Sequence, residues 1–353
     1  MQITEILAPY QDVAWLPWAV QYFFLVGLAA FSAIIAAICA FAPRGSAWAA
    51  VEPSVTTLLF VCAIAAPVSL LADLHQPGRF WHFYVNFTPW SWMSIGAVLL
   101  PLFVCLALVF CAFWWLGWRR LQRLVGVALI LSALSILLYT GMEVMVLRSR
   151  VLWNTYFVPI NFALTAWLGT VGGILLMARL LPATLDKPSR GPILVLAIGS
   201  CLALGAAAVA WVGLGLSGRE PSFDFAYDLF RDYPVWGLSL GGAVLTGALV
   251  LGMLWIWSLA ERGAMFQTML GLLMLGAAWV FRWVVLMSVQ SVPKYGAGLY
   301  LYSMPLGPDG LLGMVGILGL CIALIAIVTA GLSILPRNPR LTSSGQSLGE
   351  VTS

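Results

Sequence analysis

Nine apolar runs divide this sequence, and each is long enough to cross the hydrocarbon layer of a membrane. They cover residues 15–42, 51–73, 91–118, 122–147, 159–181, 192–217, 235–260, 264–290 and 310–335. A spanning helix needs about 20 mostly apolar residues, because lipid offers no partner to an unbonded backbone group. Only 8% of the residues are charged, whereas a soluble domain carries about 25%. We therefore expect an all-α, polytopic membrane helix bundle with about nine transmembrane helices.

The basic residues are distributed unequally between the two sides of this bundle. On the side of the N-terminus the loops carry six: Arg79, Arg148, Arg150, Arg219, Arg231 and Lys294. On the other side the loops and the tail carry ten: Arg44, Arg119, Arg120, Arg123, Arg179, Lys187, Arg190, Arg262, Arg337 and Arg340. Cytoplasmic segments carry the excess of Lys and Arg, so the N-terminus is predicted to be periplasmic and the C-terminus cytoplasmic. The predicted organisation is a periplasmic segment, a transmembrane bundle and a disordered cytoplasmic tail, at residues 1–14, 15–335 and 336–353.

Three ionisable residues stand out inside the predicted spans, where charges are rare and usually functional. Asp73, Glu143 and Arg282 each stand near the outer end of a helix, so they are expected at similar depth. A buried arginine beside a carboxylate lowers the cost of burying either charge alone. We predict that Arg282 pairs with a carboxylate, Asp73 being the first choice, in a polar layer that accepts and moves protons. The alternative is an ion pair that only fixes the packing of the helices.

Further polar residues are expected in the same layer. Gln21 lies in the first span, inside Trp18, and Tyr139 lies one helical turn before the buried glutamate on the same helix face. His75 follows the second span, and imidazole titrates near neutral pH. A quinone fits such a layer, because its head needs a hydrogen-bond partner for each oxygen and its quinol form releases two protons on oxidation. The alternatives are an interhelical hydrogen bond for Gln21 and interfacial positions for Tyr139 and His75.

Neither the cysteines nor the histidines are spaced for a metal site. The six cysteines lie singly in apolar runs, with no CxxC pair: Cys39, Cys62, Cys105, Cys111, Cys201 and Cys321. Such cysteines behave as small hydrophobic residues. The two histidines, His75 and His82, belong to one interhelical segment, whereas a membrane haem needs histidines on facing helices. We expect no haem and no metal in this chain.

Four segments together resemble a known family. They read PWAVQYFFLVGLAA, ADLHQPGRFWHFYVNFTPWSWMSIGA, LLYTGMEVMV and FRWVVLMSVQSVPKY. They are similar to the polysulfide reductase/NrfD family of membrane subunits, over residues 8 to 335. The resemblance implies a subunit without metal cofactors in a bacterial inner membrane. Such subunits anchor a periplasmic iron–sulfur (ferredoxin-like) subunit and a molybdopterin catalytic subunit, and they exchange electrons with menaquinone or ubiquinone.

The resemblance also assigns residues of this chain to a quinone site near the outer face. Gln21, Trp18 and Tyr139 match quinone-binding positions, and Asp73 and Arg282 match the acidic and basic positions of the family. Some relatives carry histidine and asparagine on the first helix where this chain has glutamine and tryptophan. A glutamine amide can hydrogen-bond a quinone oxygen but cannot accept its proton at neutral pH. Proton acceptance is then expected at water or at one of three side chains: Asp73, His75 and Glu143.

The expected function is therefore a non-autonomous one. The chain would anchor a respiratory oxidoreductase and oxidise quinol near the periplasmic face, passing the electrons to the docked iron–sulfur subunit. Two alternatives remain open. A secondary transporter or ion-translocating protein would use the buried charges as a substrate path, but the inner halves of the spans are almost purely apolar. A passive anchor would lack the quinone site.

Overall fold

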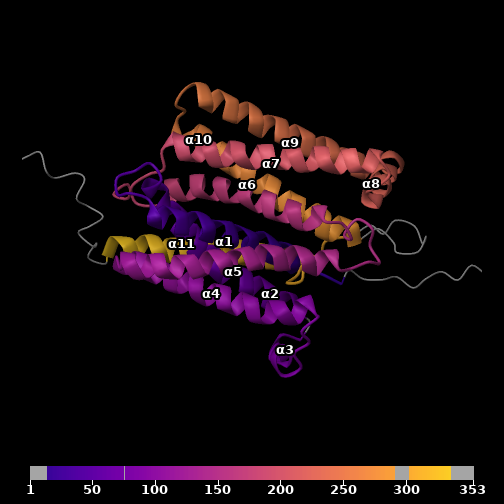
Figure 1. The fold of residues 1–353 in the computed structure, drawn as a ribbon, viewed down its shortest axis with the longest axis horizontal. Coiled ribbons are helices and arrows are strands. Elements are labelled where there is room, and N and C mark those ends of the chain that lie inside the picture. Colours follow the sequence, from indigo (N-terminus) through magenta and orange to yellow (C-terminus); the bar gives the residue numbers. More distant parts are fainter. Residues whose placement is uncertain (1–13, 75, 291–301, 335–353) are drawn as a thin grey trace, which may run out of the picture.

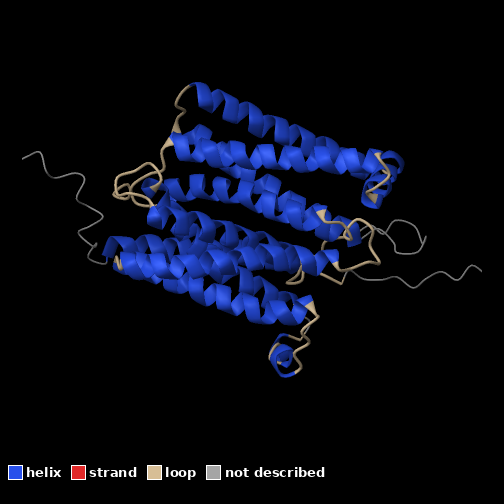
Figure 2. Cartoon of the chain, in the orientation of Figure 1, coloured by secondary structure: helices blue, strands red, loops and turns tan. Residues whose placement is uncertain are grey.

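The chain folds entirely into helices and connecting loops over the part that the structure describes (Figure 2). The structure is a computed structural model and describes residues 14–74, 76–290 and 302–334. Nine of its helices are long and apolar enough to span a membrane, so the expected nine-helix bundle is confirmed. They are α1 Pro17–Phe41, α2 Glu52–Asp73, α4 Trp92–Leu116, α5 Arg119–Met145, α6 Phe157–Leu180, α7 Arg190–Leu216, α9 Pro234–Leu259, α10 Ala264–Trp283 and α11 Leu311–Ile334. Most of the predicted N-terminal segment and all of the predicted tail lie outside the described residues.

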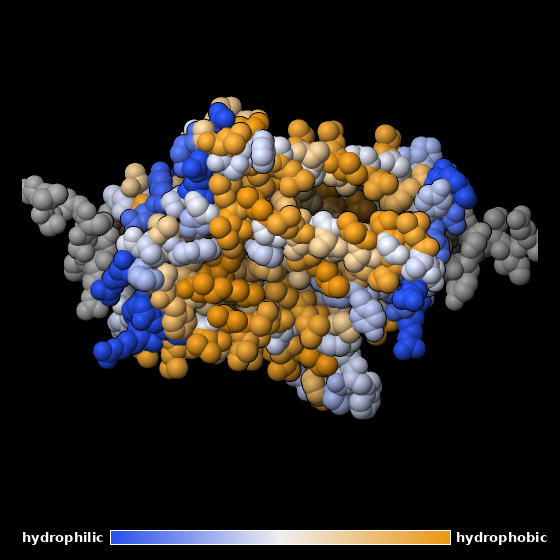
Figure 3. Space-filling model, turned by 45° about the horizontal axis from the view of Figure 1, so that its top comes forward, coloured by the Kyte–Doolittle hydropathy of each residue, from blue (hydrophilic) through white to orange (hydrophobic). Residues whose placement is uncertain are grey.

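The spanning helices run side by side and form an apolar band with polar ends. Figure 3 shows hydrophobic side chains around the middle of the molecule and hydrophilic ones at both ends. We call the end at which α1 begins the N-side and the end at which α1 finishes the C-side. The N-side is the end that carries α8 in Figure 1. Which side faces the periplasm stays a prediction.

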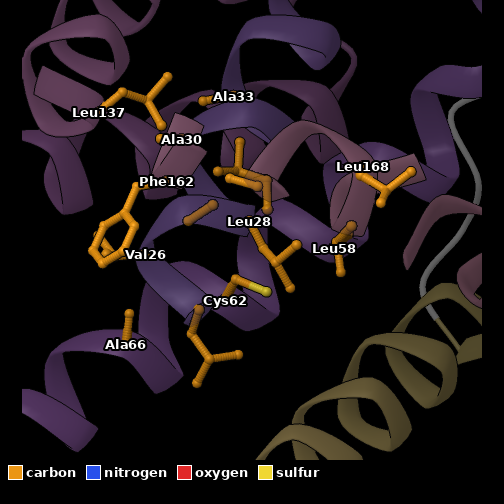
Figure 4. Close-up of a cluster of buried hydrophobic side chains, with 14 of the residues drawn as sticks. Val26, Leu28, Ala30, Ala33, Leu58, Cys62, Ala66, Leu137, Phe162 and Leu168 are labelled. Atoms are coloured by element: carbon orange, nitrogen blue, oxygen red, sulfur yellow. The ribbon is translucent and has the colours of Figure 1, made fainter. Parts of the chain in front are cut away.

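The helix α1 lies at the centre of the bundle. It packs against α2, α5 and α6, and its inward positions are small: Ala29, Ala30, Ala33, Ala36, Ala37 and Ala40. Lipid tails are as apolar as the helix surfaces, so association depends on close packing, which small residues permit. Figure 4 shows α1 side chains such as Val26 and Leu28 among those of α2 and α6. The helices α7 and α9 lie at one edge of the bundle and α4 at the opposite edge (Figure 1).

A short surface helix interrupts the connection between α7 and α9. The pattern of apolar runs predicts residues 218–234 only as a long connection, whereas the structure forms α8, Pro221–Asp232, within it. Ser222, Ala226 and Leu229 are buried at spacings of three and four residues, so one face of α8 packs against its neighbours. Glu220 caps the helix by accepting hydrogen bonds from the backbone N–H and the hydroxyl of Ser222, at 3.4 and 2.6 Å.

Candidate functional site

The N-side half of α1 presents a polar and aromatic face to its neighbours. Trp18, Gln21 and Tyr22 lie at positions i, i+3 and i+4, and therefore on one side of the helix. The Trp18 ring lies against Gly313 of α11, where a Cβ atom would meet it. Trp18 and Gln21 are half-buried, whereas Tyr22 is fully buried. The sequence pattern did not single out Tyr22, although its place beside Gln21 in a span was a usable signal.

Tyr139 is enclosed between α4, α5 and α1. Its ring occupies the space where Gly96 of α4 would carry a Cβ atom, so a glycine is needed at that position. The Tyr139 hydroxyl lies near both Tyr22 and Glu143. Only 3% of Tyr139 is exposed. The predicted pairing of Tyr139 with Glu143 on one face of α5 is thus present, and Tyr22 extends the cluster to α1.

Glu143 supplies the buried carboxyl group of this cluster. Its side chain is almost fully buried, and Oε2 makes no hydrogen bond of ordinary geometry with any described residue. The Tyr22 hydroxyl likewise lacks such a partner within the described part of the chain. A buried polar atom without a partner destabilises the fold unless water or a ligand bonds to it. The two orphaned oxygens therefore mark a place where a polar ligand group or water would be stabilised.

Asp73 joins α2 to the start of α1. One of its carboxylate oxygens accepts a hydrogen bond from the backbone N–H of Leu16, at 3.1 Å. The negative charge also lies at the positive end of the α1 helix dipole, which stabilises it. Asp73 is close enough to Glu143 for the two carboxyl groups to interact electrostatically. His75, the next predicted proton acceptor, lies outside the described residues.

Arg282 does not form the predicted ion pair. Its guanidinium donates hydrogen bonds to the Thr165 hydroxyl and, at 2.5 Å, to the Phe162 carbonyl, and no described carboxylate lies within ion-pair distance. It also lies over the Phe162 ring, with 5.0 Å between the guanidinium carbon and the ring centre. The Arg282 Nη2 approaches Gly27 of α1, where a Cβ atom would stand 3.2 Å away. Arg282 thus binds α6 to α10 beside α1, and polar and aromatic groups replace the expected carboxylate.

The N-side end of α10 departs from regular α-helix. It continues as a π-helical turn, η3 Val284–Ser288, of the kind that often occurs at functional sites. The loop between α5 and α6 binds this end: Trp153 Nε1 donates to the Val285 carbonyl at 2.7 Å, and Arg150 donates to the Val289 carbonyl at 2.8 Å. Partial burial lowers the pKa of Arg150. No sequence pattern indicated this turn.

Gln290 fixes the segment that leads into α1. Its amide accepts from the backbone N–H of Trp15 at 3.0 Å and donates to the Trp15 carbonyl at 3.1 Å. The Trp15 ring also stacks on Trp153, with 5.3 Å between ring centres. Residues far apart in the sequence therefore form one wall on the N-side, next to Asp73.

A second polar cluster lies at the C-side ends of α1, α2 and α5. Glu52 is buried and pairs with Arg119, and it accepts a hydrogen bond from Gln122 at 2.9 Å. Arg119 also donates to the carbonyl of Cys39. The expectation that the inner halves are almost purely apolar is therefore wrong at this depth. The cluster occupies helix ends, where it joins three helices, and does not extend the polar side chains of the N-side toward the midplane.

No group of three or more His, Cys, Asp or Glu side chains in metal-binding proximity occurs among the residues that the structure describes. We call the polar side chains near the N-side ends of α1, α2 and α5 the N-side layer. It contains two phenols, two carboxyl groups and one amide: Tyr22, Tyr139, Glu143, Asp73 and Gln21. Such groups can hydrogen-bond and protonate an organic ligand with two oxygens.

Comparison with known proteins agrees with a membrane-embedded subunit of this kind. Residues 6–294 match the family described as "Polysulphide reductase, NrfD". The chain belongs to this family. It is also 38% identical, over 349 residues, to a tetrathionate reductase subunit of Salmonella typhimurium (strain LT2), and the match covers 95% of this chain and 97% of that protein.

Proposed function

We propose that the chain is the quinol-oxidising membrane subunit of a respiratory molybdopterin oxidoreductase of the tetrathionate or polysulfide reductase type. The observation that carries this proposal is the buried N-side layer around Tyr139, in which Tyr22 and Glu143 each have an oxygen without a partner among the described residues. Family membership and the similarity to a tetrathionate reductase subunit support the reductase class.

The side chains of the layer fit the two ends of a quinol head. Menaquinol and ubiquinol each carry two hydroxyl groups, and oxidation to the quinone releases two electrons and two protons. Half-buried Gln21 and Trp18 form the edge that a head group reaches first. The Gln21 amide and the Tyr139 hydroxyl can each hydrogen-bond one head-group oxygen. Glu143 then accepts a proton, since its carboxyl group lies beside the Tyr139 hydroxyl.

The protons and electrons leave by different routes. Asp73 lies next to Glu143 and at the N-side end of α2, so it connects the buried carboxyl group to the aqueous side. His75 follows in the sequence as a further acceptor. Both electrons pass to a docked iron–sulfur subunit of ferredoxin type and from there to a molybdopterin subunit. In the proposed topology these partners bind the N-side, which faces the periplasm of a bacterial inner membrane.

The proposal is tested by removing the two head-group partners together. In the assembled complex, a Gln21→Ala/Tyr139→Phe variant is expected to lose most quinol-dependent tetrathionate reduction. Electron transfer from reduced viologen, which feeds the partner subunits directly, should be unchanged. Tyr156→Phe is the matched control, because Tyr156 is a strongly exposed N-side tyrosine. Unchanged quinol kinetics in the double variant would mean that the chain is a passive anchor without a quinone site.

A further inference from the structure

The connection between α2 and α4 forms an exposed aromatic projection. We call residues 76–91 the aromatic paddle; it contains η2 Pro77–Arg79 and α3 His82–Val85. The paddle lies outside the spanning helices, and its large apolar side chains are exposed: Phe80, Trp81, Tyr84, Val85, Phe87 and Trp90. Trp90 is 83% exposed and Val85 69% exposed. Contiguous exposed apolar surface of this kind marks an interaction surface.

The position of the aromatic paddle indicates what it contacts. In Figure 1, α3 lies beside the N-side ends of α2 and α4, at the flank of the bundle. It does not extend over the N-side end, where a partner subunit would dock on the bundle. One face of the adjoining helix α4 is exposed along its length, as expected of a helix that borders lipid. A segment that leaves the flank at this depth meets the headgroup layer of the bilayer.

The aromatic paddle is held in this position by specific contacts. The Tyr84 hydroxyl donates to the Ala97 carbonyl of α4, at 2.9 Å. Within the paddle, the backbone N–H of Asn86 bonds to the His82 carbonyl at 2.9 Å. The Phe80 and Tyr84 rings pack edge to face, with 6.4 Å between their centres. The exposed side chains are thus displayed by an ordered scaffold fixed to α4.

The charge of the aromatic paddle suits lipid phosphates. Residues 76–91 contain Arg79 and His82 but no aspartate or glutamate. The other N-side surface helix, α8, is net acidic: its exposed face carries Asp224, Asp228 and Asp232 and one basic residue, Arg231, which pairs with Asp228 and Asp232. Trp and Tyr concentrate at membrane interfaces, where their rings lie among the headgroups, and cationic side chains are attracted to anionic lipids.

We propose that the aromatic paddle lies in the headgroup layer of the N-side leaflet, with its aromatic side chains in lipid, and that the exposed face of α8 lies in water. This placement does not depend on the quinone proposal. One consequence of the placement does depend on the quinone proposal. The paddle is hydrogen-bonded to Ala97, and the preceding residue, Gly96, packs against Tyr139. The paddle therefore lies at the lipid-facing approach to the proposed quinone site.

The immersion depth of a spin label tests the placement. Val85→Cys and the control Tyr227→Cys, which is 58% exposed on α8, are labelled in the assembled complex in liposomes. The parent chain, treated identically, gives the background from the native cysteines. For each label we compare its collision rate with oxygen, which dissolves in lipid, to its collision rate with a water-soluble nickel chelate. The ratio of oxygen to nickel collisions should be several-fold higher at position 85 than at position 227. Phe87→Cys provides a second site in the paddle if the first variant does not assemble.

Two results would overturn the placement. One is equal nickel accessibility at positions 85 and 227 in the assembled complex. The other is a label at position 85 that is open to nickel when the membrane subunit is alone in liposomes and becomes shielded only when the partner subunits are added. That second pattern would identify the paddle as a protein docking surface. Neither readout involves quinol, so a failed quinone proposal would leave the depth result intact.

Discussion

Gly96 shows how one missing side chain shapes the candidate site. The Tyr139 ring fills the volume where a Cβ atom would stand, so α4 and α5 approach more closely there than any larger residue would allow. Close approach is the usual role of glycine between membrane helices. The position of the Tyr139 hydroxyl therefore depends on a residue in another helix.

We expect Gly96→Ala to destabilise the protein by about 1–3 kcal/mol, because overpacking forces the Tyr139 ring and its neighbours to move. Quinol-dependent activity should fall as well. Gly205→Ala in α7 is the control: nothing lies within 4 Å of its added Cβ atom, and alanine favours helix over glycine. Thermal unfolding of both variants measures the difference. Equal melting temperatures would mean that α4 adjusts without cost.

Arg282 is a buried cation stabilised by neutral groups. Hydrogen bonds to a charged group contribute about 1.5–3 kcal/mol each. Loss of the guanidinium removes the shorter of two side-chain hydrogen bonds to the Phe162 carbonyl, the other coming from the Thr165 hydroxyl at 3.4 Å. Removing the Thr165 hydroxyl removes part of the same interaction. The free energies of the two changes should therefore not be additive.

We expect Arg282→Gln and Thr165→Ala each to lower the melting temperature, and the double variant to be little worse than Arg282→Gln alone. Arg282→Gln combined with Asp73→Asn should instead give the sum of the two single effects, because the structure forms no ion pair between these residues. A double-mutant cycle with thermal unfolding tests both statements. A large coupling free energy between Arg282 and Asp73 would instead support an ion pair between them.

At the scale of elements, the π-helical turn η3 depends on a loop from elsewhere in the sequence. A π-helical turn disturbs the regular hydrogen bonding at the end of α10, and the Trp153 indole supplies a donor to the Val285 carbonyl. The Trp153 ring also stacks on Trp15, so the loop, η3 and the approach to α1 form one packed unit.

Trp153→Phe keeps an aromatic ring but removes the donor. We expect a loss of about 0.5–1.5 kcal/mol, the usual net contribution of one hydrogen bond, because the bond to the Val285 carbonyl is only partly buried. Trp255→Phe is the control, because Trp255 is exposed on the lipid-facing side of α9. Hydrogen exchange of the Val284–Ser288 amides should accelerate in Trp153→Phe and not in the control. Unchanged exchange would show that η3 is stable without the indole.

At the scale of the whole molecule, the unequal distribution of basic residues predicts a periplasmic N-side. The surface helix α8 and the loop between α6 and α7 lie on opposite sides of the bundle and expose Tyr227 and Lys187, respectively. These two positions report the orientation without altering the spans.

A cysteine at position 227 should react with a membrane-impermeant thiol reagent in intact spheroplasts, whereas one at position 187 should react only after the membrane is opened. The native cysteines lie within the spanning helices, and the unmodified chain gives their background. The reverse pattern would place the layer around Tyr139 on the cytoplasmic side.

The sequence alone determined the all-α class, the number of spans and the polar residues at the N-side helix ends. It did so because a backbone in lipid must satisfy its own hydrogen bonds, and because buried polar residues are few enough to be conspicuous. The proximity of Tyr139 to Glu143 follows from helical spacing within α5. Asp73, Glu143 and Gln21 likewise stand out by residue type and depth, whereas Trp18 was assigned to the predicted site through the family resemblance.

Only the tertiary structure decided which helices face one another. Lipid and protein core are both apolar, so the hydrophobic pattern of a spanning helix does not reveal its inward face. For that reason the partners of Arg282, the space beside Gly96 and the burial of Tyr22 could not be read from the sequence. The π-helical turn and α8 depend in the same way on neighbours distant along the chain, because packing against them stabilises conformations that local sequence does not specify.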